Sequence, residues 1–341
     1  MKDSKKDIYI HINIIKIIAC LLVIINHTIN HVLLFETKGV SFFFCLLFSF
    51  CKVAVPLFII CSGFLILEKQ YSYKKIFKNI IKVLVPLIII SGLLYVKDTG
   101  IKNINILTFI SKFLAEPYIK PYWYLYMLLG LYLITPFIQK MVKQFEKKDY
   151  YYFIIFFLFI PAILKLLLVC FGIKYSSYWL ISFVPYTIGY YVFGSYLKHD
   201  YNDININITR IIFVVSFLGM FLLSYLPSLY GNGISYKFDD VSSLPVIIMS
   251  LSLIYLLYNR FKNIKYNNKL NSFINTISST TFGIYLFHHL IGYRIFTSGL
   301  VQILCNFNIF IGYLISVIGI FVVCGIITYI LKHIPVVRDF L

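Results

Sequence analysis

The sequence has 341 residues, of which 60% are hydrophobic and only 13% are charged, and its mean hydropathy is +0.86. A soluble domain carries roughly 25% charged residues, so this composition excludes a soluble globular protein. The net charge of +18 would suggest nucleic-acid binding in a soluble chain, but here the basic residues gather in loops between apolar segments. The composition therefore predicts a membrane protein and no nucleic-acid partner.

Apolar segments of the roughly 20 residues needed to span hydrocarbon recur from end to end. They predict an all-α transmembrane helix bundle of about ten spans, with one domain over residues 1–341 and no appended soluble domain. The expected spans are 12–34, 41–67, 79–96, 122–139, 150–171, 179–197, 210–228, 242–259, 277–300 and 308–331. Lysine and arginine dominate the loops on one side, which places both termini in the cytoplasm. Heavy use of Ile, Lys, Asn, Tyr and Phe indicates an A+T-rich, bacterial genome, and hence a multi-pass protein of a bacterial plasma membrane.

The first span carries a polar stripe on an otherwise apolar helix. Lys16 and His27 are eleven positions apart, so on a helix they point the same way within about 20° and lie roughly 16 Å apart. A charge at the centre of a bilayer costs about 2.5 to 3.5 kcal/mol and usually lines a path or a site. We therefore treat Lys16 and His27 as candidate catalytic residues. Inward carboxylates are lacking, so no metal site is predicted.

The next two spans offer candidates for binding a donor substrate. Ser62 and Gly63 are small enough to allow close approach of a ligand, and equally of another helix. Lys78 and Lys82 share one face at the mouth of the third span. They can meet a phosphorylated cosubstrate from the cytoplasm, or simply anchor the chain to anionic lipid. Both alternatives stay open.

Two later spans offer candidates for binding an acceptor or moving a proton. Trp123 and Tyr126 suit either an interfacial aromatic belt or a platform for a sugar ring. In the ninth span Tyr285 and His288 share a helical face. A lone buried histidine is more often structural than catalytic. Two spans with histidine stripes can instead face one another around a shared cavity.

With these motifs in this order, the chain resembles the acyltransferase-3 family of multi-spanning bacterial membrane acyltransferases. The hallmark of the family's first helix is a basic residue, ten further residues and then His, and this chain has a similar pattern in Lys16 and His27. Its basic residue is usually Arg, and an acidic residue commonly stands three positions earlier, where this chain has Asn13. Further similar segments are P-L-F-I-I-C-S-G-F-L, the lysine-rich entry to the third span, Y-W-Y-L-Y-M-L-L-G-L-Y-L-I-T-P and F-G-I-Y-L-F-H.

The resemblance implies transfer of an acyl group, acetyl first, from cytoplasmic acyl-CoA to a hydroxyl of a surface glycan or a lipid-linked sugar. His27 would be the general base and Lys16 would hold the donor; acyl-CoA is a cosubstrate, and no other cofactor is expected. The alternative is a polysaccharide exporter or flippase, because the family resemblance includes proteins described as exporters. An ion-coupled transporter is less favoured, since no pair of Gly/Pro-interrupted spans repeats in two halves.

Overall fold

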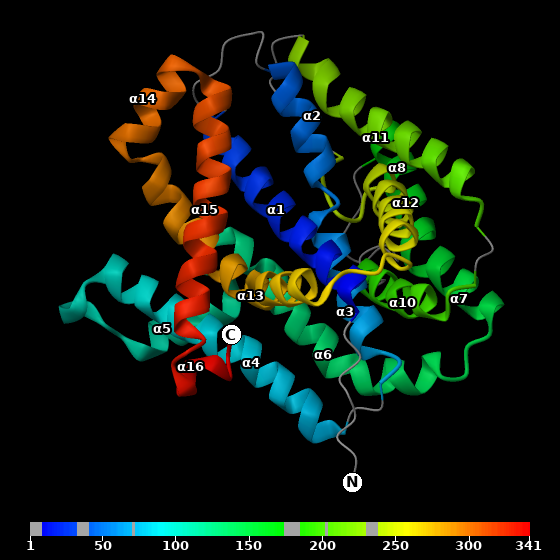
Figure 1. Ribbon diagram of the computed structural model, residues 1–341, viewed down its shortest axis with the longest axis horizontal. Helices are drawn as coiled ribbons and strands as arrows, with labels where there is room; N and C mark the ends of the chain where they lie inside the picture. The colour runs from blue at the N-terminus through cyan, green and yellow to red at the C-terminus, as the bar shows by residue number, and fades with distance from the viewer. Residues whose placement is uncertain (1–8, 33–40, 70–71, 174–184, 202–203, 230–237) are drawn as a thin grey trace.

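The computed structural model describes residues 9–32, 41–69, 72–173, 185–201, 204–229 and 238–341 (Figure 1). All regular secondary structure in these residues is helical. The helices are α1 (Ile10–Val32), α2 (Ser41–Cys51), α3 (Ala54–Ile66), α4 (Tyr73–Thr99), η2 (Ile101–Asn103), α5 (Ile106–Ala115), η3 (Lys120–Tyr122), α6 (Trp123–Val142), α7 (Lys147–Ile154), η4 (Ile155–Phe159), α8 (Ile160–Cys170), α10 (Tyr186–His199), α11 (Ile206–Leu229), α12 (Leu244–Phe261), α13 (Asn268–Phe296), α14 (Gly299–Phe307), α15 (Ile309–Leu331) and α16 (Pro335–Arg338).

Eight of these helices or consecutive helix pairs, counted in the described residues, are long and apolar enough to cross a membrane. They are α1, α2 with α3, α4, η3 with α6, α7 with α8, α11, α12 and α15. The two other expected spans correspond to α10, of which 14 residues are helical, and to the more polar α13, which has 29 residues. The prediction of an all-helical, multi-pass membrane bundle is thus confirmed.

The second expected span is interrupted four residues before a proline. Residues Lys52 and Val53 form a turn between α2 and α3, and Pro56 follows four residues after Lys52. A proline ring clashes with the carbonyl of the residue four positions earlier, so the helix opens at Lys52 and not at the proline itself. The break directs the Lys52 side chain to Asp239, 3.1 Å away.

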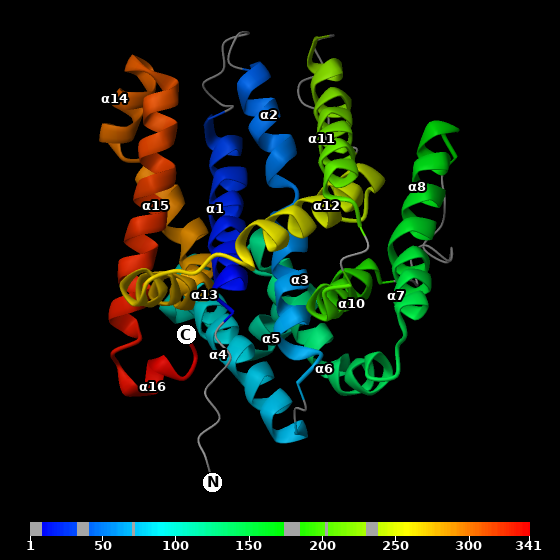
Figure 2. The ribbon, with the colours of Figure 1, turned by 45° about the vertical axis from the view of Figure 1, so that its right-hand side comes forward.

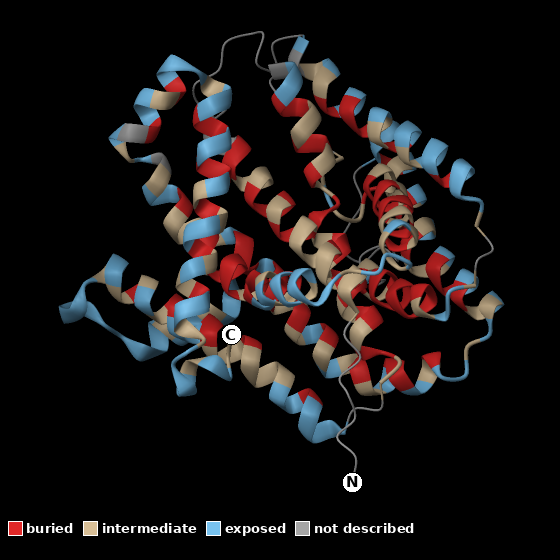
Figure 3. Ribbon diagram, viewed as in Figure 1, coloured by how far each residue is buried: buried red, intermediate tan, exposed pale blue. Residues whose placement is uncertain are grey.

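Helix α1 runs through the centre of the bundle and packs against α13, α3, α15 and α2. In Figure 2 its beginning and the end of α15 lie at the same end of the molecule. Buried residues face this centre, while the outer faces of α11 and α15 are exposed and apolar (Figure 3). Such faces suit contact with lipid, because hydrocarbon offers no penalty to apolar side chains.

Helices α3 and α10 approach each other closely at two glycines. A Cβ atom at Gly63 would lie 1.8 Å from the carbonyl oxygen of Tyr191, and one at Gly194 would lie 2.2 Å from the carbonyl oxygen of Ile60. Small residues let helix backbones approach in this way inside membranes. The structure therefore gives Gly63 a packing function.

Candidate active site

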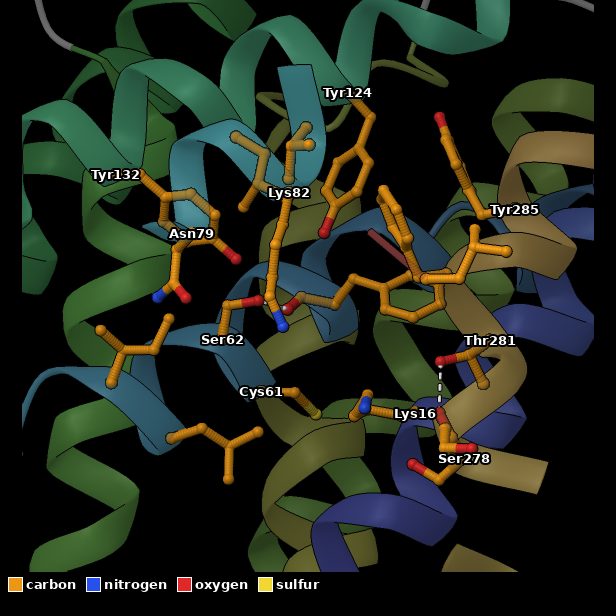
Figure 4. A pocket seen from close by; sticks show the side chains of 18 of the residues that line it. Lys16, Cys61, Ser62, Asn79, Lys82, Tyr124, Tyr132, Ser278, Thr281 and Tyr285 are labelled. Atoms are coloured by element: carbon orange, nitrogen blue, oxygen red, sulfur yellow. Dashed lines mark hydrogen bonds between the residues drawn. The ribbon is translucent and has the colours of Figure 1, made fainter. Parts of the chain in front are cut away.

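The larger cavity, which we call the Lys16 cavity, has a volume of about 390 Å³ and lies between α1, α3, α4, α6 and α13 (Figure 4). It brings together the sequence-predicted residues Lys16, Ser62, Lys82 and Tyr285. Further polar residues complete its wall: Asn79, Tyr124, Tyr132, Ser278, Ser279 and Thr281. The cavity is thus framed by several spans that are far apart in the sequence.

The Lys16 cavity is cationic. Its lining includes Lys16 from α1 and Lys82 from α4 and, among the residues that the structure describes, no Asp or Glu side chain. Within the described part of the chain, Lys16 makes no hydrogen bond or ion pair. Figure 4 shows both lysine side chains extending into the same space. A buried cation without a counter-ion is costly unless an anion pairs with it, so this cavity suits a negatively charged ligand.

The residue three positions before Lys16 explains why it lacks a carboxylate partner on its own helix. Asn13 donates through Nδ2 to Asn275 Oδ1 at 2.8 Å, and its Oδ1 accepts from Ser278 Oγ at 2.9 Å. An amide can do both because it carries a donor and an acceptor. Asn13 therefore fastens α1 to α13 and leaves the charge of Lys16 available to the cavity.

A second cavity, which we call the His27 cavity, has a volume of about 130 Å³ and lies farther along α1. His27 and Trp123 line it, together with the ion pair between Lys52 and Asp239. The two candidate catalytic residues of α1 thus line separate cavities, Lys16 the first and His27 the second.

Tyr285 is the side chain that lines both cavities. It is 5% exposed, and its hydroxyl donates a hydrogen bond to the backbone carbonyl of Pro121. The ring of Tyr124 packs against it at 5.2 Å between centroids. Tyr285 therefore stands as a partition between the cationic Lys16 cavity and the His27 cavity.

Three histidines meet beside this partition. The ring centroid of His27 lies 5.2 Å from that of His288 and 6.3 Å from that of His289. His288 Nδ1 lies 2.6 Å from the carbonyl oxygen of Tyr285. A carbonyl oxygen can only accept, so Nδ1 carries the hydrogen. The other ring nitrogen, Nε2, is buried and has no hydrogen-bond partner among the described residues.

The remaining sequence-predicted residues lie outside the two cavities. Lys78 is exposed on the surface of α4, one turn before Lys82. Gly63 packs against α10, as described above. Tyr126 donates through its hydroxyl to the carbonyl of Phe113 at 2.8 Å and so ties α6 to α5.

Sequence reasoning missed the acidic residues that pair with lysines inside the spans. Asp239 and Asp240 are adjacent and precede α12, and they pair with Lys52 at 3.1 Å and Lys165 at 2.8 Å. The signal was the presence of two lysines in apolar segments, since a buried cation calls for a counter-ion. In the described residues, no three His, Cys, Asp or Glu side chains lie close enough to hold a metal ion.

These features define a polytopic helical membrane protein with a cationic cavity and a histidine-lined cavity on either side of one tyrosine. A protein-family model described as an acyltransferase domain matches residues 9–329. The chain therefore belongs to the acyltransferase-3 family and is a membrane acyltransferase, as the resemblance of its motifs predicted. Neither the curated proteins nor the solved structures contain a match to this chain.

Proposed function

We propose that the protein moves an acyl group, in the first instance acetyl, from cytoplasmic acyl-CoA to a hydroxyl of a cell-surface glycan or its lipid-linked precursor. The acyl-CoA would enter the Lys16 cavity from the cytoplasm, and the acceptor would reach the His27 cavity from the other side of a bacterial plasma membrane. The observation that carries this proposal is the sharing of Tyr285 by an anion-attracting cavity and a cavity lined by an imidazole.

The donor would be held by charge and by hydrogen bonds. CoA carries phosphate groups, which form strong charge-assisted hydrogen bonds with lysine. Lys16 and Lys82 supply two such cations, and Ser62 and Asn79 add polar groups to the same wall. Lys78 lies on the exposed surface one turn away, where it would meet phosphate groups that remain outside the cavity.

The chemistry requires a base and a route for the proton. The acceptor oxygen bonds to the acyl carbon, the bond from that carbon to the CoA sulfur breaks, and His27 takes the proton from the acceptor hydroxyl. The same proton can then go to the departing thiolate, which leaves as CoA thiol. A neutral imidazole is the usual base for such a step. Because Tyr285 separates the cavities, the thioester must pass this ring to meet His27.

His288 extends the proton route. With Nδ1 bonded to the Tyr285 carbonyl, the neutral ring has an unprotonated Nε2, and its centroid lies 5.2 Å from that of His27. In this role His288 acts through His27 and not on the acceptor directly. Trp123, at the wall of the His27 cavity, provides an aromatic surface against which a sugar ring can pack.

The test replaces His27 by Gln and by Ala. Both variants should insert normally and lose O-acyl groups from the surface glycan, and the purified proteins should transfer no label from radiolabelled acetyl-CoA. His11→Gln is the matched control, because His11 is on the same helix and lines neither cavity. Retained transfer in His27→Gln would remove His27 from the chemistry. Loss of the glycan itself from the surface, with no acyl transfer by the wild type, would favour an exporter.

A further inference from the structure

The segment from Phe238 to Ser243 forms one wall of the His27 cavity. Asp239 and Val241 contribute to the lining. The segment is fixed at several points: Tyr190 donates to the carbonyl of Val241 at 2.8 Å, and Ser243 Oγ donates to that of Phe238 at 2.6 Å. These hydrogen bonds fix the backbone around Asp239, and the Asp239 side chain lines the cavity.

The ion pair between Lys52 and Asp239 makes the cavity neutral overall. The Lys52 side chain is 10% exposed, and its ammonium lies 3.1 Å from Asp239 Oδ2 and 3.5 Å from the centre of the Phe48 ring. In the described part of the chain, no other Asp, Glu, Lys or Arg lines the cavity. The positive charge of Lys52 is thus already balanced, in contrast to that of Lys16.

The cavity nevertheless offers hydrogen-bond acceptors to a ligand. Asn26 lines it, and Asn26 Oδ1 is buried without a hydrogen-bond partner in the described residues. The ion pair uses Oδ2 of Asp239, and Oδ1 makes no hydrogen bond to any described residue. The Asp239 side chain is 27% exposed, whereas Asn26 Oδ1 is buried. A buried acceptor such as Asn26 Oδ1 calls for a donor, and hydroxyl groups are donors without a charge.

We propose that the His27 cavity is the subsite for the acceptor and that it selects an uncharged sugar, whose hydroxyl groups donate hydrogen bonds to Asp239 and Asn26. An acceptor that carries a phosphate or carboxylate beside the reacting hydroxyl is disfavoured. This inference rests on the proposed acyl transfer. At about 130 Å³ the cavity accommodates part of a sugar ring and no polymer segment.

The selection follows from electrostatics. An anion placed in this neutral cavity finds no uncompensated cation, meets the carboxylate of Asp239 and loses its hydration, so its transfer from water is unfavourable. A sugar hydroxyl loses less hydration and gains a charge-assisted bond to Asp239. Replacing Asp239 by Asn removes the negative charge and leaves Lys52 unbalanced, which gives the cavity a net positive charge.

The experiment measures acetyl transfer from radiolabelled acetyl-CoA by the purified full-length protein in nanodiscs. The acceptors are the methyl glycosides of glucose, galactose and N-acetylglucosamine, compared with methyl glucuronide and glycerol 3-phosphate. The variants are Asp239→Asn and Asp240→Asn. Asp240 is the matched control because it is the next residue, makes the same kind of ion pair with Lys165 at 2.8 Å, and does not line the cavity.

We expect the wild type to prefer the neutral glycosides. Asp239→Asn should raise the acceptor KM for them about tenfold, the usual consequence of losing one hydrogen bond to a charged group, while the KM for acetyl-CoA stays unchanged. Asp239→Asn should also reduce or reverse the preference for the neutral glycosides over methyl glucuronide. Asp240→Asn should change neither quantity more than about twofold, as expected for a partly exposed ion pair.

Three results would overturn this subsite assignment: a wild-type preference for the anionic acceptors, equal effects of the two substitutions, or an unchanged acceptor KM in Asp239→Asn. Transfer to none of the acceptors would also reject the neutral acceptor class. If acetyl-CoA still bound to the wild type and not to Lys16→Ala, the donor site of the proposed function would survive that result. If acetyl-CoA did not bind, the proposed function would fail as well.

Discussion

The ring of His27 on α1 and the ring of His288 on α13 lie 5.2 Å apart, with an angle of 39° between their planes. The two helices are held in register at another level by Asn13, which bonds to Asn275 and Ser278 of α13. The polar faces of these helices thus meet at two levels, through Asn13 near the start of α1 and through the histidine pair farther along it.

The first prediction distinguishes the functions of the two ring nitrogens of His288. The amide of Asn can replace Nδ1 as donor to the Tyr285 carbonyl, whereas the amide of Gln reaches the position of Nε2. If Nε2 serves the proton route, His288→Gln and His288→Asn should both lower kcat by about 10²–10⁴-fold, because an amide is neither an acid nor a base at neutral pH. The measurement is acetyl transfer by the purified variants. Greater activity in the Asn variant would assign His288 a structural function through Nδ1.

The second prediction concerns Lys16. Lys16→Ala should raise the KM for acetyl-CoA by about 10- to 100-fold, because it removes a charge-assisted contact to phosphate. Lys16→Arg keeps the charge and should fall between the wild type and the Ala variant, since the planar guanidinium does not reproduce lysine geometry. The measurement is a titration with acetyl-CoA.

Lys74→Ala serves as its control, because Lys74 is exposed in the first turn of α4 and does not line the Lys16 cavity. It should leave the KM for acetyl-CoA within about twofold of the wild type. Equal activity of the Ala and Arg variants at position 16 would contradict a charge-based donor site.

The sequence was sufficient to predict the all-helical bundle and its family, because both depend on local patterns. Apolar runs of membrane length are visible in any single segment, and the interval from Lys16 to His27 puts both on one helical face. The same arithmetic predicts that they lie roughly 16 Å apart along the helix. It could not show that a ring from α13 stands between them, since the position of Tyr285 depends on how the two helices dock.

The ion pair that lines the His27 cavity could not be predicted from local sequence patterns for the same reason. Lys52 and Asp239 are 187 positions apart, and neither residue has a motif around it. Gly63 illustrates the opposite case: its sequence neighbourhood allowed a ligand or a helix, and only the observed backbone of α10 distinguishes them. Long-range docking, and not local propensity, therefore decides which polar residues form the site.

The third prediction tests the packing function of Gly63. Gly63→Ala places a methyl group on the Tyr191 carbonyl, so α3 and α10 must separate, at a cost of about 1–3 kcal/mol for overpacking. The thermal unfolding midpoint in detergent should fall. Gly130→Ala is the control, because nothing lies within 4 Å of a Cβ at that position in α6. A stable Gly63→Ala protein with a raised KM for acetyl-CoA would instead favour contact with the donor.

The fourth prediction concerns the partition at Tyr285. Tyr285→Phe keeps the ring and removes the hydrogen bond to Pro121, whereas Tyr285→Ala joins the two cavities. Both changes should lower transfer to the acceptor, and the Ala variant should raise hydrolysis of acetyl-CoA by water relative to transfer. The measurement is the ratio of free acetate to acetylated acceptor.

Tyr132→Ala is the control for the partition, since Tyr132 lines the Lys16 cavity and not the His27 cavity. It enlarges the donor side and should leave the ratio of hydrolysis to transfer near that of the wild type. An equal rise in both Ala variants would show that cavity size, and not the partition, protects the thioester from water.

The last prediction follows from the pKa of Asp240. Burial alone would raise this pKa, but hydrogen bonds from Lys165 and Ser242 and the charge of Lys165 outweigh burial and hold it below the usual value. A carboxyl group with a lowered pKa stabilises the folded state above its unfolded pKa of about 3.9, and this contribution is lost as the pH falls through the folded value. The Asp240 side chain is 46% exposed, so solvent screening limits the contribution to about 1 kcal/mol or less. Asp240→Asn should therefore lower the thermal midpoint modestly at pH 7 and by a smaller amount at pH 3, measured in the same detergent. A difference between variant and wild type that grows on acidification would contradict the assigned ion pair.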